Sequence, residues 1–423
     1  MSATATIFPG RVSGTVAAPA SKSVAQRAFA AAMLARGASH IYLNSWCDDT
    51  RAVLESIVQM GVTVHDTGDG VLIDSSNGLQ IPPVVHFGES GLATRMLTPL
   101  LACFDQTVTI TGEGSLQRRS MHFFDEVLPQ LGVAFRSANG YLPFTLKGPL
   151  VARSITLDGS ASSQYLTGIL MAIAYCSREP VRLHVTGLKS KPYIALTIEV
   201  LRAFGIRVMQ EAYTHFDIPG GQPYTPAHFR VEGDWSGAAF LMVAAAIGGS
   251  VTITNLNRTS AQADRVVEAV IQQSGAVVQW NGAALQVQQK ERHAFTFDAT
   301  DCPDLFPPLA ALAACCSGSS RIKGLHRLAN KESNRALTIQ TELEKLGIPV
   351  TFEADELIIT GGRPIAGGVT LDSHHDHRIA MMGAVLGTVA QKPVTINHAA
   401  AVHKSYPGFY TDLERLNITV ENR

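Results

Sequence analysis

The stretch DDTRAVLESIVQMGV, residues 48–62, has the pattern of an amphipathic helix that ends at a glycine and is followed by an aliphatic residue. A residue in the left-handed conformation commonly ends a helix; glycine adopts it freely and asparagine tolerates it. The same ending recurs every 70 to 73 residues, as Gly61-Val62, Gly132-Val133, Gly205-Ile206, Gly275-Ala276, Gly347-Ile348 and Asn417-Ile418. The chain therefore carries six repeats.

Each repeat predicts the order strand, helix, strand, helix, strand, strand. The first helices are rich in Ala, Leu and Met nearly all round, which indicates burial on several sides, whereas the second helices are amphipathic. The loops that open the first helices lie at Ser23, Ser90, Ser162, Ser236, Asp304 and Asp376. A single βαβαββ unit cannot bury both of its faces, so the copies must pack together. We therefore predict an α/β (α+β) fold with two domains, each an inside-out α/β barrel of three repeats around a pseudo-threefold axis.

The best linker in the chain is the polar stretch EAYTHFDIPGGQPYTPAHFR, residues 211–230, between repeats three and four. A chain of 423 residues is also long enough for two or three domains. We expect the crossing between domains near Val231 to Asp234. One domain would be discontinuous, with residues 1–20 and 233–423, and the other would comprise residues 21–232.

The composition favours a globular protein. Hydrophobic residues make up 46% of the chain and the formal net charge is −1, which argues against non-specific nucleic-acid binding. We see neither a secretory signal nor an apolar run of the roughly 20 residues that a membrane span needs. The six cysteines form no C-x-x-C pair, so we expect free, reduced thiols in the cytoplasm.

Several of the loops that open helices carry groups suited to anions. Lys22, Ser23 and Arg27 place cations at a helix start, where the backbone amides also favour negative charge. The loop 88–95 has two glycines that permit close approach to a ligand, and the loop 158–164 offers hydroxyls and an amide. Each loop by itself is equally well explained as a solvated, capped helix start.

The second half of the chain adds carboxylates beside cations. Asp304 lies in Asp-Cys-Pro-Asp, and Lys331-Glu332 precedes a later helix, where it could also be an ordinary helix-start pair. Asp376-His-Arg378 and His403-Lys404 complete the set. This division suggests that one half binds substrate while the other supplies acid–base groups.

Two other kinds of site fit the sequence less well. The cluster His374-His375-Asp376-His377 suggests a metal, but adjacent histidines point in different directions and no partner cluster appears, so we predict no metal. Cys302 could be a nucleophile, yet a buried structural thiol fits better. No Walker loop or dinucleotide fingerprint follows a strand.

At these positions the chain resembles the EPSP synthase (3-phosphoshikimate 1-carboxyvinyltransferase) family of enolpyruvyl transferases over essentially its whole length. The motifs that carry the resemblance are Ser21-Lys-Ser-x-x-x-Arg27, Gly159-Ser-x-Ser-Ser-Gln164, Ser190-Lys-Pro-Tyr193, Val231-Glu-Gly-Asp234, Pro303-Asp304, Lys331-Glu-Ser-x-Arg335, Asp376-His-Arg378 and Lys404. The resemblance implies that shikimate 3-phosphate and phosphoenolpyruvate (PEP) are converted to 5-enolpyruvylshikimate 3-phosphate and phosphate, without metal or cofactor. It also implies a cytoplasmic enzyme of aromatic amino acid biosynthesis, and we expect a monomer whose two domains close over the substrates.

The resemblance also implies roles for single residues. Asp304 would take the proton from the 5-hydroxyl, Glu332 would protonate the methylene carbon of PEP, and Lys22 would assist at both substrates. The residues implied for shikimate 3-phosphate are Lys22, Ser23, Arg27, Ser162, Ser163, Gln164, Ser190, Tyr193, Asp304 and Lys331. Those implied for PEP are Lys22, Gly91, Arg119, Arg335, Arg378 and Lys404.

The chain departs from the family pattern at four positions. Glu89 and Leu92 stand where Asn and Thr are usual, Asn334 where many members have Asp, and Ser120 where proline is usual. A carboxylate near PEP would repel it unless it is paired, and Arg95 or Lys22 could provide the partner. These departures leave open the PEP affinity, the response to PEP-like inhibitors and the possibility of an inactive paralogue.

Two different functions were compared with this one. A related enzyme transfers enolpyruvyl to UDP-N-acetylglucosamine and uses a cysteine in a mobile loop of the second repeat, but residues 112–119 contain none. A ring-shaped binding protein of six repeats would favour a basic inner surface and would need no paired carboxylates. The sequence favours the shikimate enzyme over both.

Overall fold

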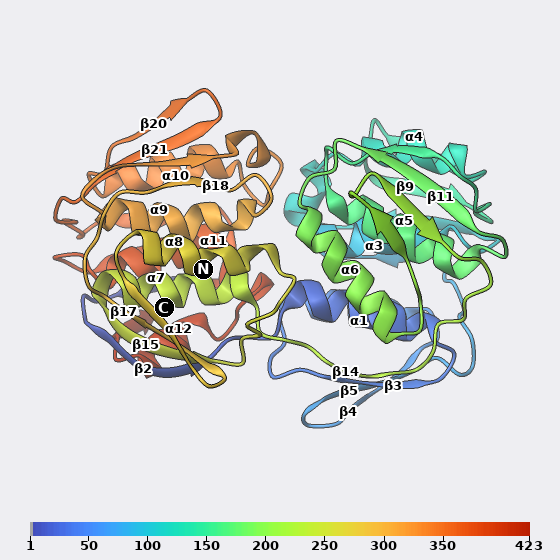
Figure 1. The fold of residues 1–423 in the computed structure, drawn as a ribbon, viewed down its shortest axis with the longest axis horizontal. Helices are drawn as coiled ribbons and strands as arrows, with labels where there is room; N and C mark the ends of the chain where they lie inside the picture. Colours follow the sequence, from blue (N-terminus) through green and yellow to red (C-terminus); the bar gives the residue numbers. More distant parts are fainter. Residues whose placement is uncertain (1–2) are drawn as a thin grey trace. The chain divides into compact units, whose positions relative to one another are not determined.

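The structure is a computed structural model that describes residues 3–423, and the chain folds into two compact units. Unit 1 comprises the residues up to Pro19 together with Glu232–Arg423, and unit 2 comprises Ala20–Val231. Within residues 3–423, the strands form six four-stranded sheets, three in each unit (Figure 1).

Unit 2 contains the first three repeats. Its helices are α1 (Lys22–Leu34), α2 (Asp48–Gln59), α3 (Gly91–Leu101), the 3₁₀ helix η1 (Gly114–Arg118), α4 (His122–Gln130), α5 (Ser163–Cys176) and α6 (Lys191–Ala203). Its strands are β3 (Ala38–Tyr42), β4 (Thr63–Asp66), β5 (Gly70–Asp74), β6 (Val84–His86), β7 (Thr107–Thr111), β8 (Ala134–Ala138), β9 (Tyr141–Lys147), β10 (Thr156–Asp158), β11 (Val181–Thr186), β12 (Met209–Glu211), β13 (His215–Ile218) and β14 (His228–Arg230).

Unit 1 contains the last three repeats and the N-terminal strands. Its helices are α7 (Trp235–Gly248), η2 (Ala263–Val266), α8 (Val267–Gln273), η3 (Pro303–Leu305), α9 (Phe306–Cys315), η4 (Leu325–Arg327), α10 (Arg335–Lys345), α11 (His377–Gly387), η5 (Ala399–Lys404) and α12 (Phe409–Arg415). Its strands are β1 (Thr4–Ile7), β2 (Val12–Ala17), β15 (Gly249–Thr254), β16 (Val277–Asn281), β17 (Ala284–Gln288), β18 (Thr296–Asp298), β19 (Gly318–Lys323), β20 (Val350–Glu353), β21 (Glu356–Gly361), β22 (Thr370–Asp372), β23 (Val394–Asn397) and β24 (Val420–Asn422).

The predicted βαβαββ order is confirmed for the first five repeats, whereas the sixth ends after a single strand, β24. In the second repeat β6 pairs in parallel with β7 across α3, and β9 and then β8 continue the sheet in antiparallel pairs. The third and fifth repeats have the same arrangement, in the orders β10-β11-β13-β12 and β18-β19-β21-β20. A parallel pair needs a crossover connection, which the first helix provides in repeats two, three, five and six.

Three sheets take a strand from another part of the sequence. Strand β14 pairs in parallel with β3 in the sheet of repeat one, and β2 pairs in parallel with β15 in the sheet of repeat four. Strand β1 lies between β23 and β24 and pairs antiparallel with both, so it completes the sixth sheet. The expected linker at residues 211–230 is therefore wrong in part, because it contains β13 and β14, which are strands of two different sheets.

The first helices form the centre of each unit, as predicted. In unit 2, α3 and α5 pack against each other and α1 packs against α3; in unit 1, α7, α9 and α11 pack together (Figure 1). Every residue of α3, α9 and α11 is buried, whereas α2 and α10 bury only one face. The predicted helix endings are also confirmed, with φ of +87° at Gly61 and +68° at Asn417.

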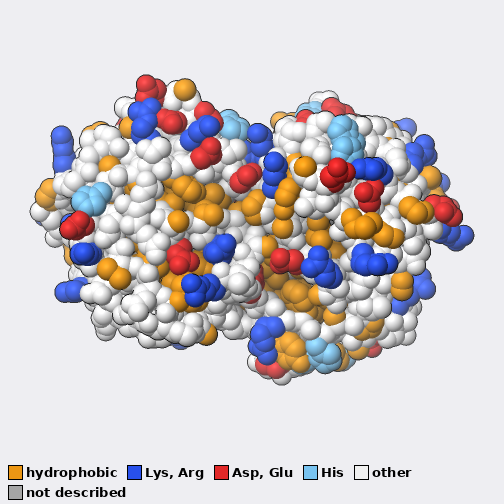
Figure 2. All heavy atoms as spheres, in the orientation of Figure 1, with side chains coloured by type: hydrophobic (Ala, Val, Ile, Leu, Met, Phe, Trp, Pro, Cys, Tyr) orange, Lys and Arg blue, Asp and Glu red, His pale blue; other side chains and the backbone are white. Residues whose placement is uncertain are grey.

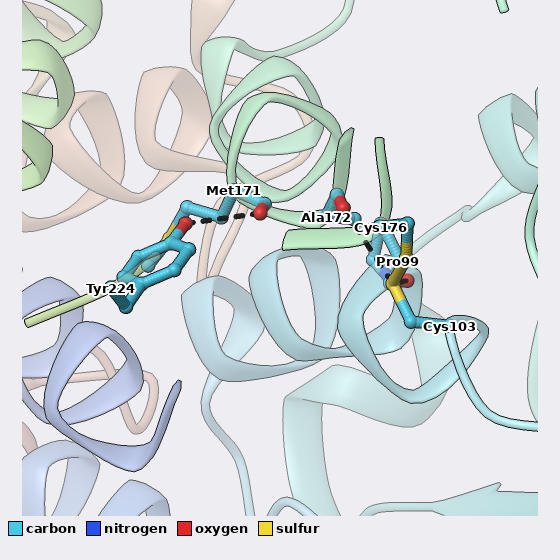
Figure 3. The surroundings of a disulfide bond; sticks show 6 residues. All are labelled: Pro99, Cys103, Met171, Ala172, Cys176 and Tyr224. Atoms are coloured by element: carbon cyan, nitrogen blue, oxygen red, sulfur yellow. Dashed lines mark hydrogen bonds between the residues drawn. A yellow bond between two sulfur atoms is a disulfide. The ribbon is translucent and has the colours of Figure 1, made fainter. Parts of the chain in front are cut away.

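The expectation that all six cysteines are free thiols is wrong for one pair. The structure joins Cys103, just after α3, to Cys176 at the end of α5 in a disulfide (Figure 3). The packing of α3 on α5 places the Cα atoms of Cys103 and Cys176 6.2 Å apart, within the range that a disulfide spans. Cys47, Cys302, Cys315 and Cys316 are free and buried.

The surface and the helix lengths agree with the composition. On the face seen in Figure 2, Lys and Arg side chains are interspersed with Asp and Glu, in keeping with the net charge of −1. In the described part of the chain, no helix is both long enough and apolar enough to span a bilayer.

Candidate active site

Three carboxylates of unit 1 converge on the side chain of Arg335, at the start of α10. Arg335 Nη1 donates to Asp304 Oδ1 at 2.6 Å, Nη2 donates to Glu332 Oε2 at 2.6 Å, and Nε donates to Asp376 Oδ2 at 2.8 Å. The side chain of Arg335 is 1% exposed. Burial would lower its pKa, but the three carboxylates outweigh burial and raise it, so Arg335 stays charged. One buried cation thus brings both predicted acid–base carboxylates into one cluster.

Asp304 also contacts two further cations. Lys331 Nζ lies 3.2 Å from its Oδ1, and Arg378 Nη2 lies 3.2 Å from its Oδ2. Burial would raise the pKa of Asp304, but Arg378, Lys331 and Arg335 hold it well below its ordinary value. Asp304 is therefore ionised at neutral pH, the form that can accept a proton.

The loop before α11 fixes the position of Arg378. Asp376 is the N-cap of α11, and its Oδ1 accepts a hydrogen bond from the backbone amide of Arg378 at 2.9 Å. The side chain of Arg378 is 2% exposed. Within residues 3–423 its Nε and Nη1 have no hydrogen-bond partner. Buried polar groups are nearly always paired, so two charged donors without an acceptor are suited to an anionic ligand.

Lys404 and the histidines of this loop have separate partners. Lys404 Nζ donates to the carbonyl oxygen of His375 at 3.0 Å. His374 Nε2 lies 2.8 Å from the buried carboxylate of Glu342, and the ring of His375 contacts that of His398 at a tilt of 37° with centroids 4.0 Å apart. The histidines thus point in different directions, as expected, and the described residues contain no group of three or more His, Cys, Asp or Glu arranged for a metal.

The structure also bears on two other predictions for unit 1, the helix-start pair Lys331-Glu332 and the thiol of Cys302. The pair Lys331-Glu332 lies in the loop before α10, whose N-cap is Asn334, so the reading as an ordinary helix-start pair is wrong. Cys302 is buried, and burial raises its pKa well above the ordinary value. A buried thiol with a raised pKa is a poor nucleophile.

In unit 2, hydrogen bonds join the starts of α1, α3 and α5. Ser90, the N-cap of α3, donates from Oγ to Gln26 Oε1 of α1 at 3.3 Å. Arg95 of α3 donates to Oε1 of Gln164, in the first turn of α5, at 2.8 Å. Three helix N-termini therefore meet in one region, which favours negative charge. Lys22, the first residue of α1, pairs with Asp49 of α2 at 2.8 Å.

Arg27 lies deeper than Lys22, among α1, α5 and α6. Its Nε donates to Thr197 at 2.9 Å, its Nη2 to Thr167 at 3.3 Å and its Nη1 to the carbonyl oxygen of Ser23 at 2.8 Å. Burial lowers its pKa to about 10, which still leaves it charged at neutral pH.

The predicted hydroxyl and aromatic residues lie at the starts of α5 and α6. Ser162 is the N-cap of α5, its Oγ accepts from the amide of Gln164 at 3.3 Å, and Ser163 is the first residue of the helix. Ser190 is the N-cap of α6 with a left-handed backbone, φ +53°, and Tyr193 follows in the first turn.

The glycine loop before α3 is covered by two arginines. A Cβ atom on Gly91 would lie 2.7 Å from Arg119 Nη1 and 3.0 Å from Arg95 Nη1, so only glycine leaves room for both guanidinium groups. Arg95, expected only as a possible partner of Glu89, thus lies beside two predicted site residues, Gly91 and Gln164. Glu89 Oε2 accepts a hydrogen bond from the backbone amide of Ser115 at 2.9 Å, and Leu92 is buried within α3.

Two further residues, Asp49 and Asp376, contact predicted site residues, although the sequence analysis gave neither of them a role. The signal for both was their position, since each lies at the start of a helix that follows a predicted strand. Their effect is indirect, because each fixes a cation through an ion pair or a cap.

Comparisons with known proteins agree on one family. The sequence pattern of EPSP synthase (3-phosphoshikimate 1-carboxyvinyltransferase) matches residues 8–413. Among curated relatives, 3-phosphoshikimate 1-carboxyvinyltransferase from Clostridium kluyveri is 34% identical over 411 residues, covering 97% of this chain and 96% of the relative. The enzyme of that name from Methanocorpusculum labreanum is 34% identical over 413 residues, with 96% of each chain covered.

The fold gives the same result. The structure of EPSP synthase from Acinetobacter baumannii superimposes with a TM-score of 0.83 at 27% identity, covering 100% of both chains. The enolpyruvyl transferase NikO from Streptomyces tendae, at 19% identity and a TM-score of 0.78, shares the fold, covering 100% of this chain and 99% of its own. The chain therefore belongs to the EPSP synthase family.

Proposed function

We propose that this chain transfers the enolpyruvyl group of PEP to the 5-hydroxyl of shikimate 3-phosphate and releases phosphate. The family match over residues 8–413 gives the reaction class. The observation that carries the proposal is the cluster on Arg335, where two carboxylates suited to acid–base work share one buried cation.

The proposed binding residues form two sets, and each set contains residues from both halves of the chain. For shikimate 3-phosphate we propose Lys22, Ser23, Arg27, Ser162, Ser163, Gln164, Ser190, Tyr193, Asp304 and Lys331. For PEP we propose Lys22, Gly91, Arg119, Arg335, Arg378 and Lys404. Two polyanions that react with each other need cations on several sides, and both sets provide them.

The addition step needs one acid and one base. PEP becomes electrophilic at C2 when its methylene carbon C3 takes a proton, which Glu332 would supply. The 5-hydroxyl oxygen then bonds to C2 while its proton passes to Asp304, which is ionised for this purpose. The product of this step is a tetrahedral ketal that still carries the phosphate.

The elimination step reverses the proton transfer at C3. A proton leaves the new methyl group, the C2–O bond to phosphate breaks, and the carbon–carbon double bond re-forms. Glu332, now a carboxylate, would take that proton, and Asp304 would pass the proton from the 5-hydroxyl to the departing phosphate. Arg335 and Arg378 would stabilise that phosphate. One carboxyl group thus acts first as acid and then as base.

The charge balance of the cluster supports these roles. Arg335, Lys331 and Arg378 face Asp304, Glu332 and Asp376, so three positive charges meet three negative ones. Protonating Glu332 leaves one positive charge in excess, which favours a bound anion. Taking up the proton that the reaction needs and binding PEP would therefore reinforce each other.

A coupled phosphate-release assay tests the proposal. We expect phosphate only when PEP and shikimate 3-phosphate are both present, and no release when UDP-N-acetylglucosamine replaces shikimate 3-phosphate. Absence of phosphate release from pure, folded protein would reject the assignment. Release with PEP and UDP-N-acetylglucosamine, but not with PEP and shikimate 3-phosphate, would instead indicate the other enolpyruvyl transferase activity.

We further propose that the enzyme works as a cytoplasmic monomer and needs no metal or cofactor. The mechanism above assigns each proton and each charge to a side chain of the chain itself. Full activity after exhaustive treatment with a chelator is the expected result.

A further inference from the structure

Glu89 contacts the start of the 3₁₀ helix η1, which carries Arg119 at its far end. We propose that Glu89 is a positioning residue for PEP binding, because it holds η1 in place and η1 in turn places the guanidinium group of Arg119. The inference rests on the proposed role of Arg119 in binding PEP.

Two contacts hold the start of η1 against the carboxylate. Glu89 Oε2 accepts a hydrogen bond from the backbone amide of Ser115 at 2.9 Å. Gly114 has φ +56°, and a Cβ atom there would lie 2.7 Å from Glu89 Oε1, so the carboxylate fills the space that a side chain would need. The backbone amide of Glu113 also donates to the carbonyl oxygen of Gly88 at 2.9 Å. The same loop thus contacts η1 through its backbone and through Glu89.

The far end of η1 returns to the same loop. Arg119 is the C-cap of η1, its amide donates to Leu116 at 3.1 Å, and its side chain is buried. Its Nη1 approaches Gly91, where a Cβ atom would lie 2.7 Å away. Residues 88–91 therefore contact both ends of η1. A shift of its first residues would move Arg119 relative to the start of α3.

This arrangement also explains how a carboxylate can stand beside a proposed PEP site. Glu89 Oε2 accepts from the amide of Ser115 at the start of η1, where backbone donors lack partners within the helix. A hydrogen bond from an N–H to a charged group is stronger than one to a neutral group. The negative charge thereby helps to fix the backbone at the start of η1.

The test compares Glu89→Ala and Glu89→Gln with a matched control, Glu113→Gln. Glu113 is an exposed glutamate and the N-cap of η1, and it makes no side-chain capping bond, so E113Q removes a charge at the same helix without removing a contact. We expect E89A to raise the KM for PEP about tenfold, the factor that corresponds to about 1.4 kcal/mol. The kcat and the Kd for shikimate 3-phosphate should stay within about twofold.

E89Q and the control separate the hydrogen bond from the charge. The side-chain oxygen of glutamine can accept the same amide proton, so E89Q should keep the KM for PEP within about threefold of wild type, as should E113Q. An unchanged KM in E89A would overturn the inference. A KM in E89Q as high as in E89A, or below that of wild type, would also overturn it, because the charge and not the hydrogen bond would then set PEP binding.

A second measurement does not depend on turnover. Amide hydrogen exchange of residues 113–119 should be faster in E89A than in wild type and unchanged in E89Q, while α3 keeps its protection. If the wild-type protein released no phosphate, the proposed function would fail, yet faster exchange in E89A would still support the contact. Equal exchange in all variants would refute the positioning role even in an active enzyme.

Discussion

Replacing Asp304 by asparagine removes the negative charge that three cations share. The carboxylate of Asp304 lies 2.6 Å from Arg335 and 3.2 Å from both Lys331 and Arg378, and its side chain is 26% exposed. Breaking a buried ion pair typically costs about 3–5 kcal/mol. Because Asp304 is partly exposed, we expect a loss of about 3 kcal/mol, at the lower end of that range. For a unit of about 200 residues this corresponds to a fall in Tm of roughly 6–12 °C.

The same substitution predicts a pH dependence with a definite sign. The three cations hold the pKa of Asp304 well below its ordinary value in the folded protein. A group whose pKa is lowered by folding stabilises the protein above its unfolded pKa of about 3.9, and this contribution is lost as the pH falls through the folded value. The difference in Tm between wild type and D304N should therefore be constant above about pH 5 and should shrink below about pH 4.

The matched control is Asp298→Asn, in the same repeat. Asp298 also pairs with a lysine, Lys323 at 3.4 Å, but both side chains are 54% exposed. An exposed pair contributes at most about 1 kcal/mol, so D298N should change the Tm little and leave the phosphate-release rate intact. D304N should lower that rate by about 10²–10⁴-fold. A Tm of D304N equal to that of wild type at pH 7, or a difference that widens in acid, would refute the reasoning.

Three further substitutions or measurements test other parts of the site and the fold. Glu332→Gln should still bind both substrates, as measured by calorimetry, but its turnover should fall by about 10²–10⁴-fold, as measured by phosphate release. Turnover like that of wild type would reject the acid role of Glu332. Gly91→Ala places a Cβ atom 2.7 Å from Arg119 Nη1, so the KM for PEP should rise while the Kd for shikimate 3-phosphate stays the same. Equal rises in both would contradict the assignment of Gly91 to PEP binding. Thiol titration of the unfolded protein should find the four free cysteines before reduction and all six after it, and six before reduction would show that Cys103 and Cys176 are not joined.

The repeat architecture could be predicted from the sequence because its signals are local. A helix that must end at Gly61 or Asn417 carries that requirement in one residue, and the structure gives both a positive φ. A helix buried on all sides has to be apolar on all sides, which is visible in the composition of α3 and α11. Features of the fold that depend on a single segment could therefore be predicted from the sequence.

The features that were missed depend on which distant segments meet. Nothing in the residues of β1 indicates that this strand pairs with β23 and β24, more than 380 residues away along the chain. The pairing of Cys103 with Cys176 follows from the packing of α3 on α5, and cysteine spacing alone does not report it. The resemblance named Arg335, but its three-way contact with Asp304, Glu332 and Asp376 needed coordinates.

The caps of the first helices explain why six similar helix starts can serve two different tasks. In unit 2 the N-caps of α1, α3 and α5 are neutral, namely Ser21, Ser90 and Ser162. In unit 1 the N-caps of α7 and α11 are carboxylates, Asp234 and Asp376, while that of α9 is Leu305. A neutral cap leaves the positive end of the helix dipole available to an anion, whereas a carboxylate cap largely neutralises it. Under the proposed function, phosphate binding in unit 1 would come from side chains such as Arg378. A side-chain cation can share its charge with a carboxylate that moves a proton. We therefore propose that the same backbone favours ligand binding in one unit and acid–base chemistry in the other. Replacing Ser162 by aspartate and Asp376 by serine should weaken both.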